Sequence, residues 1–203
     1  MNVNPSELRL VELYSILSAT VQPRPIAWVS TVDSKGRQNL APFSFFTVAS
    51  INPPVLCFSP LLDRDKNEKN TLVNIRELGE FVVNIVSYEV VEKMNRTGAP
   101  YPAGDSEFVK VGLTPQSSDT IKPPSVGEAR VCFECKLQQI ISLGTEPLAG
   151  KLVLGQICRI RIDDELFHEG RLEDLRLDAV GRMGGCRYTT TRDTFELPRA
   201  VIE

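Results

Sequence analysis

Residues 23 to 60 read PRPIAWVSTVDSKGRQNLAPFSFFTVASINPPVLCFSP, and this stretch decides the fold. Residues 24 to 32 are rich in apolar and β-branched side chains, residues 33 to 36 read DSKG, and residues 37 to 50 are again of strand composition. Two such runs on either side of a turn that contains glycine predict a β-hairpin. A third strand is expected at residues 55 to 59, after the breaker NPP.

The second strand of this hairpin contains a proline, Pro42, among apolar residues. Proline lacks a backbone donor and is found at sheet edges or bulges, so a bulge is predicted at this point. A bulge exposes backbone N–H and C=O groups, here beside Phe43 and Phe45. Such a surface suits a planar ring with a polar edge, such as an isoalloxazine. An ordinary bulged hairpin packed on a core explains the same residues.

Length and composition favour an ordinary globular protein. The chain has 203 residues, 42% of them hydrophobic and 24% charged, and its net charge is −3. A chain of this size buries roughly 70% of the surface that its unfolded form exposes. The acidic balance argues against a general nucleic-acid surface, and no apolar run reaches membrane length. We therefore expect a cytoplasmic protein without nucleic-acid or membrane partners, with one domain over 1–203 and an arm or helix over 1–20.

The further elements follow from side-chain periodicity. A helix with Asn70 or Thr71 as its N-cap is predicted to end at Gly79, because Leu72, Ile75 and Leu78 recur at helical spacing. A strand over residues 81 to 86 and a helix over residues 88 to 95 should follow. Residues 131 to 143 and 151 to 163 are expected to be the two longest strands. The whole pattern is that of a barrel-like β domain with short helices.

Five cysteines are present, and two of them form the motif Cys132-x-x-Cys135. This spacing is compatible with a redox pair or half of a zinc site. Residues three apart on a strand point to opposite faces, however, so separate strand cysteines are expected. A zinc site also lacks ligands, because His168 is the only histidine and no second such motif exists. No metal site is predicted.

The start of the helix at residue 70 is a candidate phosphate site. A helix N-terminus offers free N–H groups and the positive end of the helix dipole, and Lys69 adds a charge. Thr31 and Ser59 end two of the predicted strands and supply hydroxyl groups near the same place. A capped surface helix with a solvated lysine is the simpler interpretation of Lys69 and Thr71.

The order of these motifs resembles the flavin reductase-like family of FMN-binding split barrels, the group that includes flavoredoxin. The resemblance covers about residues 20 to 199. It is carried by RPIAWVST, NLAPFSFFTVAS, NPPV, KNT at 69 to 71, EFVVNI at 80 to 85, Glu107-Phe108, FECK at 133 to 136, LGQ at 154 to 156 and RMGGCRY at 182 to 188. It implies a mainly β fold, a split β-barrel of Greek-key-like order with a few short helices.

The resemblance also implies a site for FMN. Nothing in the chain looks like an adenine site, so FMN is expected rather than FAD. The family more often has Asp where Asn70 stands, although Asn caps a helix equally well. Relatives are homodimers with FMN at the subunit interface, and Arg182 is a candidate clamp from the neighbouring subunit. The expected cofactor-binding residues are Thr31, Asn39, Ala41, Pro42, Phe43, Ser44, Phe45, Ser59, Lys69, Asn70, Thr71 and Arg182.

The source of electrons is open at this point. The chain has no G-x-G-x-x-G between a strand and a helix, so a dedicated dinucleotide domain is not expected. If NAD(P)H is the donor, it must reach the flavin transiently. Short flavin reductases tend to carry Gly-Asp-His near His168, but the local sequence differs, so His168 is only a weak catalytic candidate. The expected function is a flavin reductase-type oxidoreductase that passes electrons through FMN to free flavin or another acceptor, and a non-catalytic electron carrier is the alternative.

Overall fold

The computed structural model describes residues 2 to 102 and 104 to 200. Its largest sheet is antiparallel and has seven strands in the order β3-β2-β6-β9-β10-β5-β4. The bounds are β2 Ala27–Val32, β3 Gln38–Phe43, β4 Phe46–Ser50, β5 Val55–Phe58, β6 Glu80–Ile85, β9 Val131–Ser142 and β10 Lys151–Ile162. Every run expected to be extended contains a strand, although the run over residues 37 to 50 is divided into β3 and β4; β9 and β10 are the longest strands, as predicted.

The sheet is curled because of where its two edges lie. Strands β3 and β4 are consecutive in the chain, yet they form opposite edges of the sheet, and only Ser44 and Phe45 separate them. Such a short connection requires the two edges to meet. The carbonyl of Phe45 accepts a hydrogen bond from the Ser59 N–H at 2.8 Å, which holds the connection against the end of β5. The sheet is therefore a half-barrel with a seam at residues 44 and 45, and the predicted mainly β split barrel is confirmed.

The bulge predicted at Pro42 is wrong. Pro42 lies opposite Trp28 in an uninterrupted β2–β3 ladder, and the strand continues to Phe43. The proline is tolerated because β3 is an edge strand, where a missing N–H removes no bond to a further neighbour. The strand is interrupted at the seam instead, where Ser44 follows Phe43.

The inner face of the half-barrel is closed by helix α2 (Asn70–Leu78). Its buried Leu72 and Ile75 pack into a cluster with side chains from five strands: Ala27, Val29, Leu56, Phe58, Phe81, Val83, Cys135 and Val153. The helix ends at Gly79, whose φ of 69° is the left-handed conformation that glycine adopts without strain. Its N-cap is Lys69, one residue before the first of the two predicted positions, and no side-chain cap bond is made there; the Thr71 hydroxyl is bonded to Asn39 instead.

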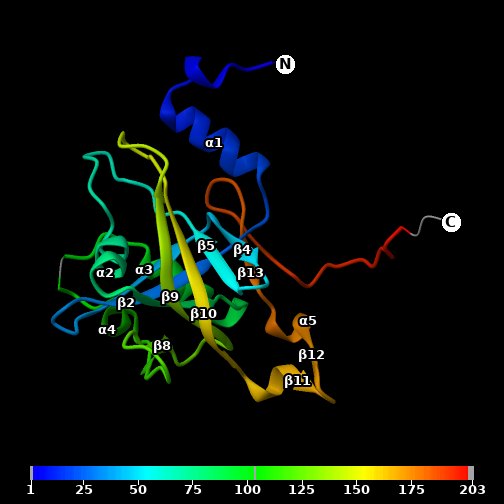
Figure 1. Cartoon of the computed structure of the whole chain (residues 1–203). Helices are drawn as coiled ribbons and strands as arrows, with labels where there is room; N and C mark the ends of the chain where they lie inside the picture. Colours follow the sequence, from blue (N-terminus) through cyan, green and yellow to red (C-terminus); the bar gives the residue numbers. More distant parts are fainter. Residues whose placement is uncertain (1, 103, 201–203) are drawn as a thin grey trace.

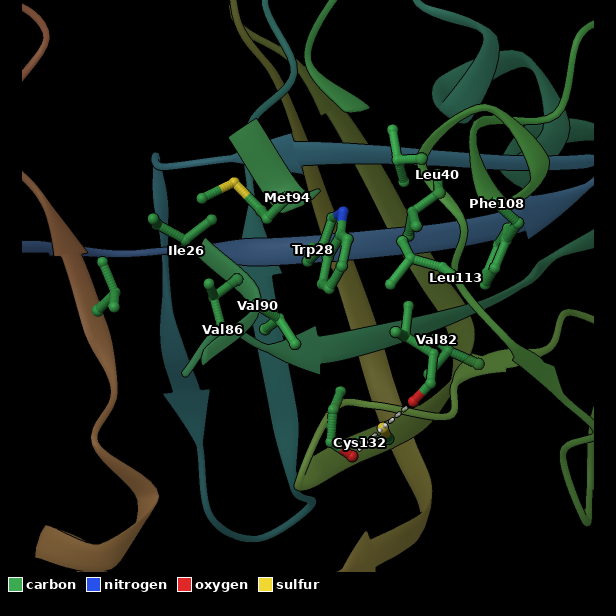
Figure 2. Close-up of a cluster of buried hydrophobic side chains, with 14 of the residues drawn as sticks. Ile26, Trp28, Leu40, Val82, Val86, Val90, Met94, Phe108, Leu113 and Cys132 are labelled. Carbon is green, nitrogen blue, oxygen red and sulfur yellow. Dashed lines mark hydrogen bonds between the residues drawn. The ribbon is translucent and has the colours of Figure 1, made fainter. Parts of the chain in front are cut away.

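The outer face is covered by α3 (Val91–Thr97) and α4 (Glu107–Val111). Figure 2 shows this second cluster, with Trp28 at its centre and Met94 and Ile26 at one end. The indole N–H of Trp28 donates to Thr97 Oγ1 at 2.9 Å, so its one polar atom is satisfied inside the core. Cys132 belongs to this outer cluster and Cys135 to the inner one. The two cysteines therefore point to opposite faces, as predicted.

The remaining elements are short. Helix α1 (Leu10–Thr20) follows the 3-10 turn η1 (Pro5–Glu7), and η2 (Tyr88–Val90) leads into α3, so the helix predicted over residues 88 to 95 is split in two. A small sheet joins β1 (Arg24–Pro25), β13 (Val180–Arg182) and β14 (Tyr188–Thr190). The others are β7 (Pro115–Gln116), β8 (Ser125–Val126), η3 (Asp164–Leu166), β11 (Phe167–His168), β12 (Arg171–Leu172) and α5 (Asp174–Leu177).

Three segments project from the half-barrel in Figure 1: α1, the β11–β12–α5 excursion, and residues 191 to 200 after β14. Ser18 is the only buried residue of α1, so the helix contributes little to either core. No helix in residues 2 to 102 or 104 to 200 is long and apolar enough to span a membrane.

Candidate functional site

A cavity of 260 Å³ opens at the seam of the half-barrel. Three segments between residues 42 and 69 meet here: the β3–β4 connection, the residue after β5, and the N-terminus of α2. The lining residues are Tyr14, Pro42, Phe43, Ser44, Phe45, Ser59, Leu61 and Lys69. Six of these eight were expected at a flavin site from the sequence, and Lys69 is the one charged residue among them.

The α2 end of this cavity has the donors that a phosphate requires. Intrahelical bonds begin with the N–H groups of Leu72 and Val73, both to the Lys69 carbonyl, so those of Asn70 and Thr71 lie outside the helical ladder. The first turn of α2 contains no acidic residue, and the Lys69 ammonium stands beside it. This combination of free N–H groups, helix dipole and cation favours an anion.

A glycine keeps the Ser59 hydroxyl accessible at this end. A β-carbon at Gly150 would lie 2.6 Å from Ser59 Oγ, closer than real atoms approach, so a larger residue there would displace the hydroxyl. The chemistry of the donor set, an ammonium, a hydroxyl and helix N–H groups, fits the phosphate of FMN. Phe43 and Phe45 supply the apolar surface that a flavin ring needs.

Thr31 and Thr71 lie behind this surface rather than on it. Both side chains are buried, and Asn39 connects them: its Nδ2 donates to Thr71 Oγ1 at 2.9 Å and to Thr31 Oγ1 at 3.3 Å. Asn74, which the sequence did not single out, donates to Thr31 Oγ1 at 3.0 Å. These four side chains form a polar network between β2, β3 and α2, and the network holds the N-terminus of α2 in place.

The structure separates the other predicted residues from the seam. Asn39 and Asn70 line a different, polar cavity of 230 Å³, and Ala41 is a half-buried member of the β2–β3 ladder. His168 is on the β11–β12 hairpin with its side chain 67% exposed, and it lines none of the cavities described here. Among the described residues, no group of three or more His, Cys, Asp or Glu side chains is placed to hold a metal ion.

Two larger cavities continue the groove on either side. One of 550 Å³ shares Tyr14, Pro42 and Ser44 with the seam cavity, and one of 420 Å³ shares Tyr14, Phe45 and Leu61. Ligand sites typically measure about 300 to 1,000 Å³. The seam cavity alone falls short of that range, but together with its neighbours the groove is large enough for a cofactor and a second small molecule.

Sequence reasoning missed Tyr14 and Leu61 in the seam cavity. Tyr14 comes from α1, where its ring centroid lies 6.4 Å from that of Phe45. Periodicity marks α1 as a helix but does not show that it reaches the seam. Arg182 was expected at a cofactor, and it lines the 550 Å³ cavity together with Tyr188 and Asn95.

The fold is a curled antiparallel half-barrel, and the N-terminus of α2 lies at its seam beside Phe43 and Phe45. The model of the flavin reductase like domain matches residues 20–176 of this chain. The chain belongs to the flavin reductase-like family.

Known relatives cover the chain nearly end to end. An uncharacterized protein of Halalkalibacterium halodurans, BH2278, is 37% identical over 100% of this chain and 98% of its own length. The crystal structure of nitrilotriacetate monooxygenase component B from Bacillus cereus is similar with a TM-score of 0.92 and 34% identity, covering 97% of this chain and 98% of that one. The 2-nitrobenzoate 2-nitroreductase NbaA of Pseudomonas fluorescens has a TM-score of 0.88 and 31% identity, covering 98% and 96%. These relatives support an oxidoreductase role for the chain.

Proposed function

We propose that the protein is an FMN-dependent oxidoreductase that takes electrons from NAD(P)H and passes them through bound FMN to free flavin or another small acceptor. The observation that carries this proposal is the convergence of six expected residues on the seam cavity, from three separate elements between residues 42 and 69. A coincidence of local motifs would leave such residues scattered over the surface.

Each part of the cofactor is bound by residues of matching chemistry. Lys69, Ser59 and the N–H groups at the start of α2 hold the phosphate, because they are the donors at the α2 end of the cavity and Lys69 is the one cation among its described lining residues. Phe43 and Phe45 contact the ring face, and the backbone of Ser44, which lies between two strands, bonds its polar edge. When bound, FMN supplies hydride acceptance and one- or two-electron transfer, while the protein supplies position and electrostatics.

The choice of acceptor is guided by the relatives. One relative is named as a monooxygenase component and another as a nitroreductase, so the names of the relatives point to different electron acceptors. A small molecule can reach the seam here through either neighbouring cavity. An electron carrier that keeps its FMN and exchanges electrons with a protein is the alternative outcome of the test below.

We further propose that the protein is a homodimer with the flavin near the subunit interface. Phe195 and Leu197, in the extended segment after β14, are 88% and 84% exposed. Large apolar side chains held away from the body of the chain favour contact with a second copy. Light scattering of the purified protein would give twice the mass of one chain, and a monomer at all concentrations would contradict the dimer.

The cofactor is tested by titrating the purified protein with FMN and with riboflavin, which lacks the phosphate. We expect Lys69→Gln to weaken FMN binding by about 10- to 100-fold, the loss of one charge-assisted contact, and to leave riboflavin binding unchanged. Lys66→Gln is the matched control, because Lys66 lies three residues away and pairs with Glu146 on the surface. Failure of the unmodified protein to bind FMN would overturn the proposed function.

The donor is tested on the flavin-loaded protein under anaerobic conditions. Flavin absorbance that bleaches on addition of NADH or NADPH, with reduced free flavin accumulating over repeated turnovers, supports the reductase. Flavin bands that persist until dithionite is added, and that stay with the protein on gel filtration, identify the electron carrier instead.

A further inference from the structure

The 550 Å³ cavity next to the seam has a composition that the cofactor does not require. Its floor is apolar and comes from the buried Ile26 and Met94, which lie together at one end of the outer cluster in Figure 2. Its walls come from α1, the β3–β4 connection, the end of α3 and the small C-terminal sheet. The complete lining is Tyr14, Ile26, Pro42, Ser44, Met94, Asn95, Gly98, Ala99, Arg182 and Tyr188.

Arg182 places a fixed cation in this cavity. Its guanidinium donates to the Tyr188 hydroxyl and to the Gly185 carbonyl, at 2.6 Å for the latter, and lies over the Tyr188 ring, 4.6 Å from its centroid. The Tyr188 hydroxyl in turn donates to Asn95 Oδ1 at 2.8 Å. All these partners are neutral, and within residues 2 to 102 and 104 to 200 no carboxylate pairs with Arg182. The side chain is held in one orientation while its charge stays available.

A second cation, Arg24, lies behind the β3–β4 connection that forms one wall of this cavity. Arg24 is only 5% exposed, and its guanidinium donates to the carbonyls of Ser18 at 2.5 Å and Val21 at 2.8 Å, and to Ser44 Oγ at 3.4 Å. It too has only neutral partners in the described chain. Two guanidinium groups without carboxylates, in a protein whose net charge is −3, give this cavity a locally positive potential.

We propose that this cavity binds a small organic acid, with its carboxylate on Arg182 and a planar apolar body on the Ile26–Met94 floor. The planar guanidinium matches a carboxylate geometrically, and it has further N–H groups beyond the two that the protein uses. The apolar floor distinguishes such an acid from an inorganic anion, which gains nothing from Ile26 and Met94. If this acid is also the reaction partner of the flavin, that role rests on the proposed function. The binding site itself does not.

The probe is benzoate, titrated calorimetrically into the full chain with and without FMN. We expect benzoate to bind, Arg182→Gln to weaken it by about 10- to 100-fold, and Arg182→Lys to weaken it less, since a lysine keeps the charge but loses the fork. Arg187→Gln is the matched control, because Arg187 lies in the same turn, is exposed, and within the described residues its side chain hydrogen-bonds only the Gly184 carbonyl. Benzamide, the neutral analogue, is expected to bind at least tenfold more weakly than benzoate.

A second variant tests the cavity without touching the cation. Ala99 is exposed at the rim, so Ala99→Trp fills the cavity from outside and should abolish benzoate binding while the thermal unfolding midpoint stays unchanged. Lack of benzoate binding by the unmodified protein, equal binding by Arg182→Gln, or equal affinity for benzamide would each overturn the proposal. Inorganic phosphate that binds as tightly as benzoate would overturn the role of the apolar floor.

The same titrations separate this inference from the proposed function. A protein that binds FMN but not benzoate retains its proposed function and lacks the acid site. A protein that binds benzoate through Arg182 but no FMN has the acid site without the proposed function. A protein that binds both, with benzoate changing the flavin spectrum in the unmodified chain and not in Arg182→Gln, has the acid next to the flavin.

Discussion

Phe81 occupies the space that a side chain at Gly155 would need. Strand β10 passes the ring so closely that a β-carbon on Gly155 would collide with Cζ and would lie 3.0 and 3.1 Å from the two neighbouring ring carbons. Phe81 is fully buried in the inner cluster, where it also contacts Phe58 edge-on at a centroid distance of 5.5 Å. The register of β10 shifts at this glycine, so the close approach coincides with a bend in the strand.

Gly155→Ala is therefore expected to destabilise the protein by about 1 to 3 kcal/mol, the usual cost of an overpacked core. Urea unfolding followed by circular dichroism gives the free energy. The matched experiment is the double variant Gly155→Ala, Phe81→Leu, in which the smaller side chain makes room for the methyl group. The double variant should be more stable than the sum of the two single effects predicts, and strict additivity would show that the two residues do not compete for space.

The local elements of this fold are predictable from the sequence, and the sheet order is not. A period of two identifies β9 and β10, and a period of 3.6 with a closing glycine identifies α2, because these signals depend only on neighbours in the chain. Pairing is a relation between distant segments. Nothing within residues 37 to 50 indicates that β3 and β4 would form opposite edges of one sheet.

The same distinction between local and long-range information applies to the residues of the candidate site. Lys69 and Ser59 were predicted because a helix start and a strand end display their own polar groups, whereas residues 42 to 45 were predicted from a bulge that the strand does not have and from the family resemblance. Thr31 was expected at the same place, yet it is buried behind Asn39, since the packing of α2 against β2 decides which hydroxyl faces outward. Tyr14 reaches the seam from α1 across a turn whose direction no local pattern specifies.

The network behind the seam predicts a ranking of two isosteric variants. Thr31 Oγ1 accepts from both Asn39 and Asn74, whereas Thr71 Oγ1 accepts from Asn39 alone. Thr31→Val leaves the buried amide of Asn74 without this acceptor and removes one of the two acceptors of the half-buried Asn39, so it should cost more stability than Thr71→Val, which we expect to cost about 1 to 2 kcal/mol. Thr47→Val, on the exposed face of β4, is the control and should change little. Urea unfolding compares them, and equal losses for the two buried threonines would contradict the network.

The five thiols are expected to react in three classes with a disulfide reagent. Cys158 and Cys186 are exposed and should react first, and the half-buried Cys57, whose pKa is raised by burial, more slowly. Burial raises the pKa of Cys132 to about 11 although the Arg161 guanidinium opposes it, and burial also raises that of Cys135. These two should stay silent until the protein unfolds. Reaction of all five thiols at one rate in the folded protein would contradict the buried positions of Cys132 and Cys135 in the two clusters.

Glu107 should make stability depend on pH in a predictable direction. Its buried carboxylate accepts the N–H of Leu40 at 2.9 Å, and its pKa is raised, chiefly by burial and also by nearby Asp105, although the Leu40 N–H opposes the shift. Because the folded-state pKa lies above the unfolded value, folding favours the protonated acid. The stability from this group is complete below the unfolded pKa, near 4.5, and is lost as pH rises through the folded pKa.

Glu107→Gln removes the buried charge and keeps an oxygen that accepts the Leu40 N–H. We expect the variant to gain stability relative to the unmodified protein as pH rises above about 4.5, and the difference to level off once Glu107 is ionised. Urea unfolding at several pH values between 4.5 and 8 measures this difference, with the exposed Glu89→Gln as control. Two stability curves that run parallel over this range would show that Glu107 has the same pKa in the folded and unfolded chains.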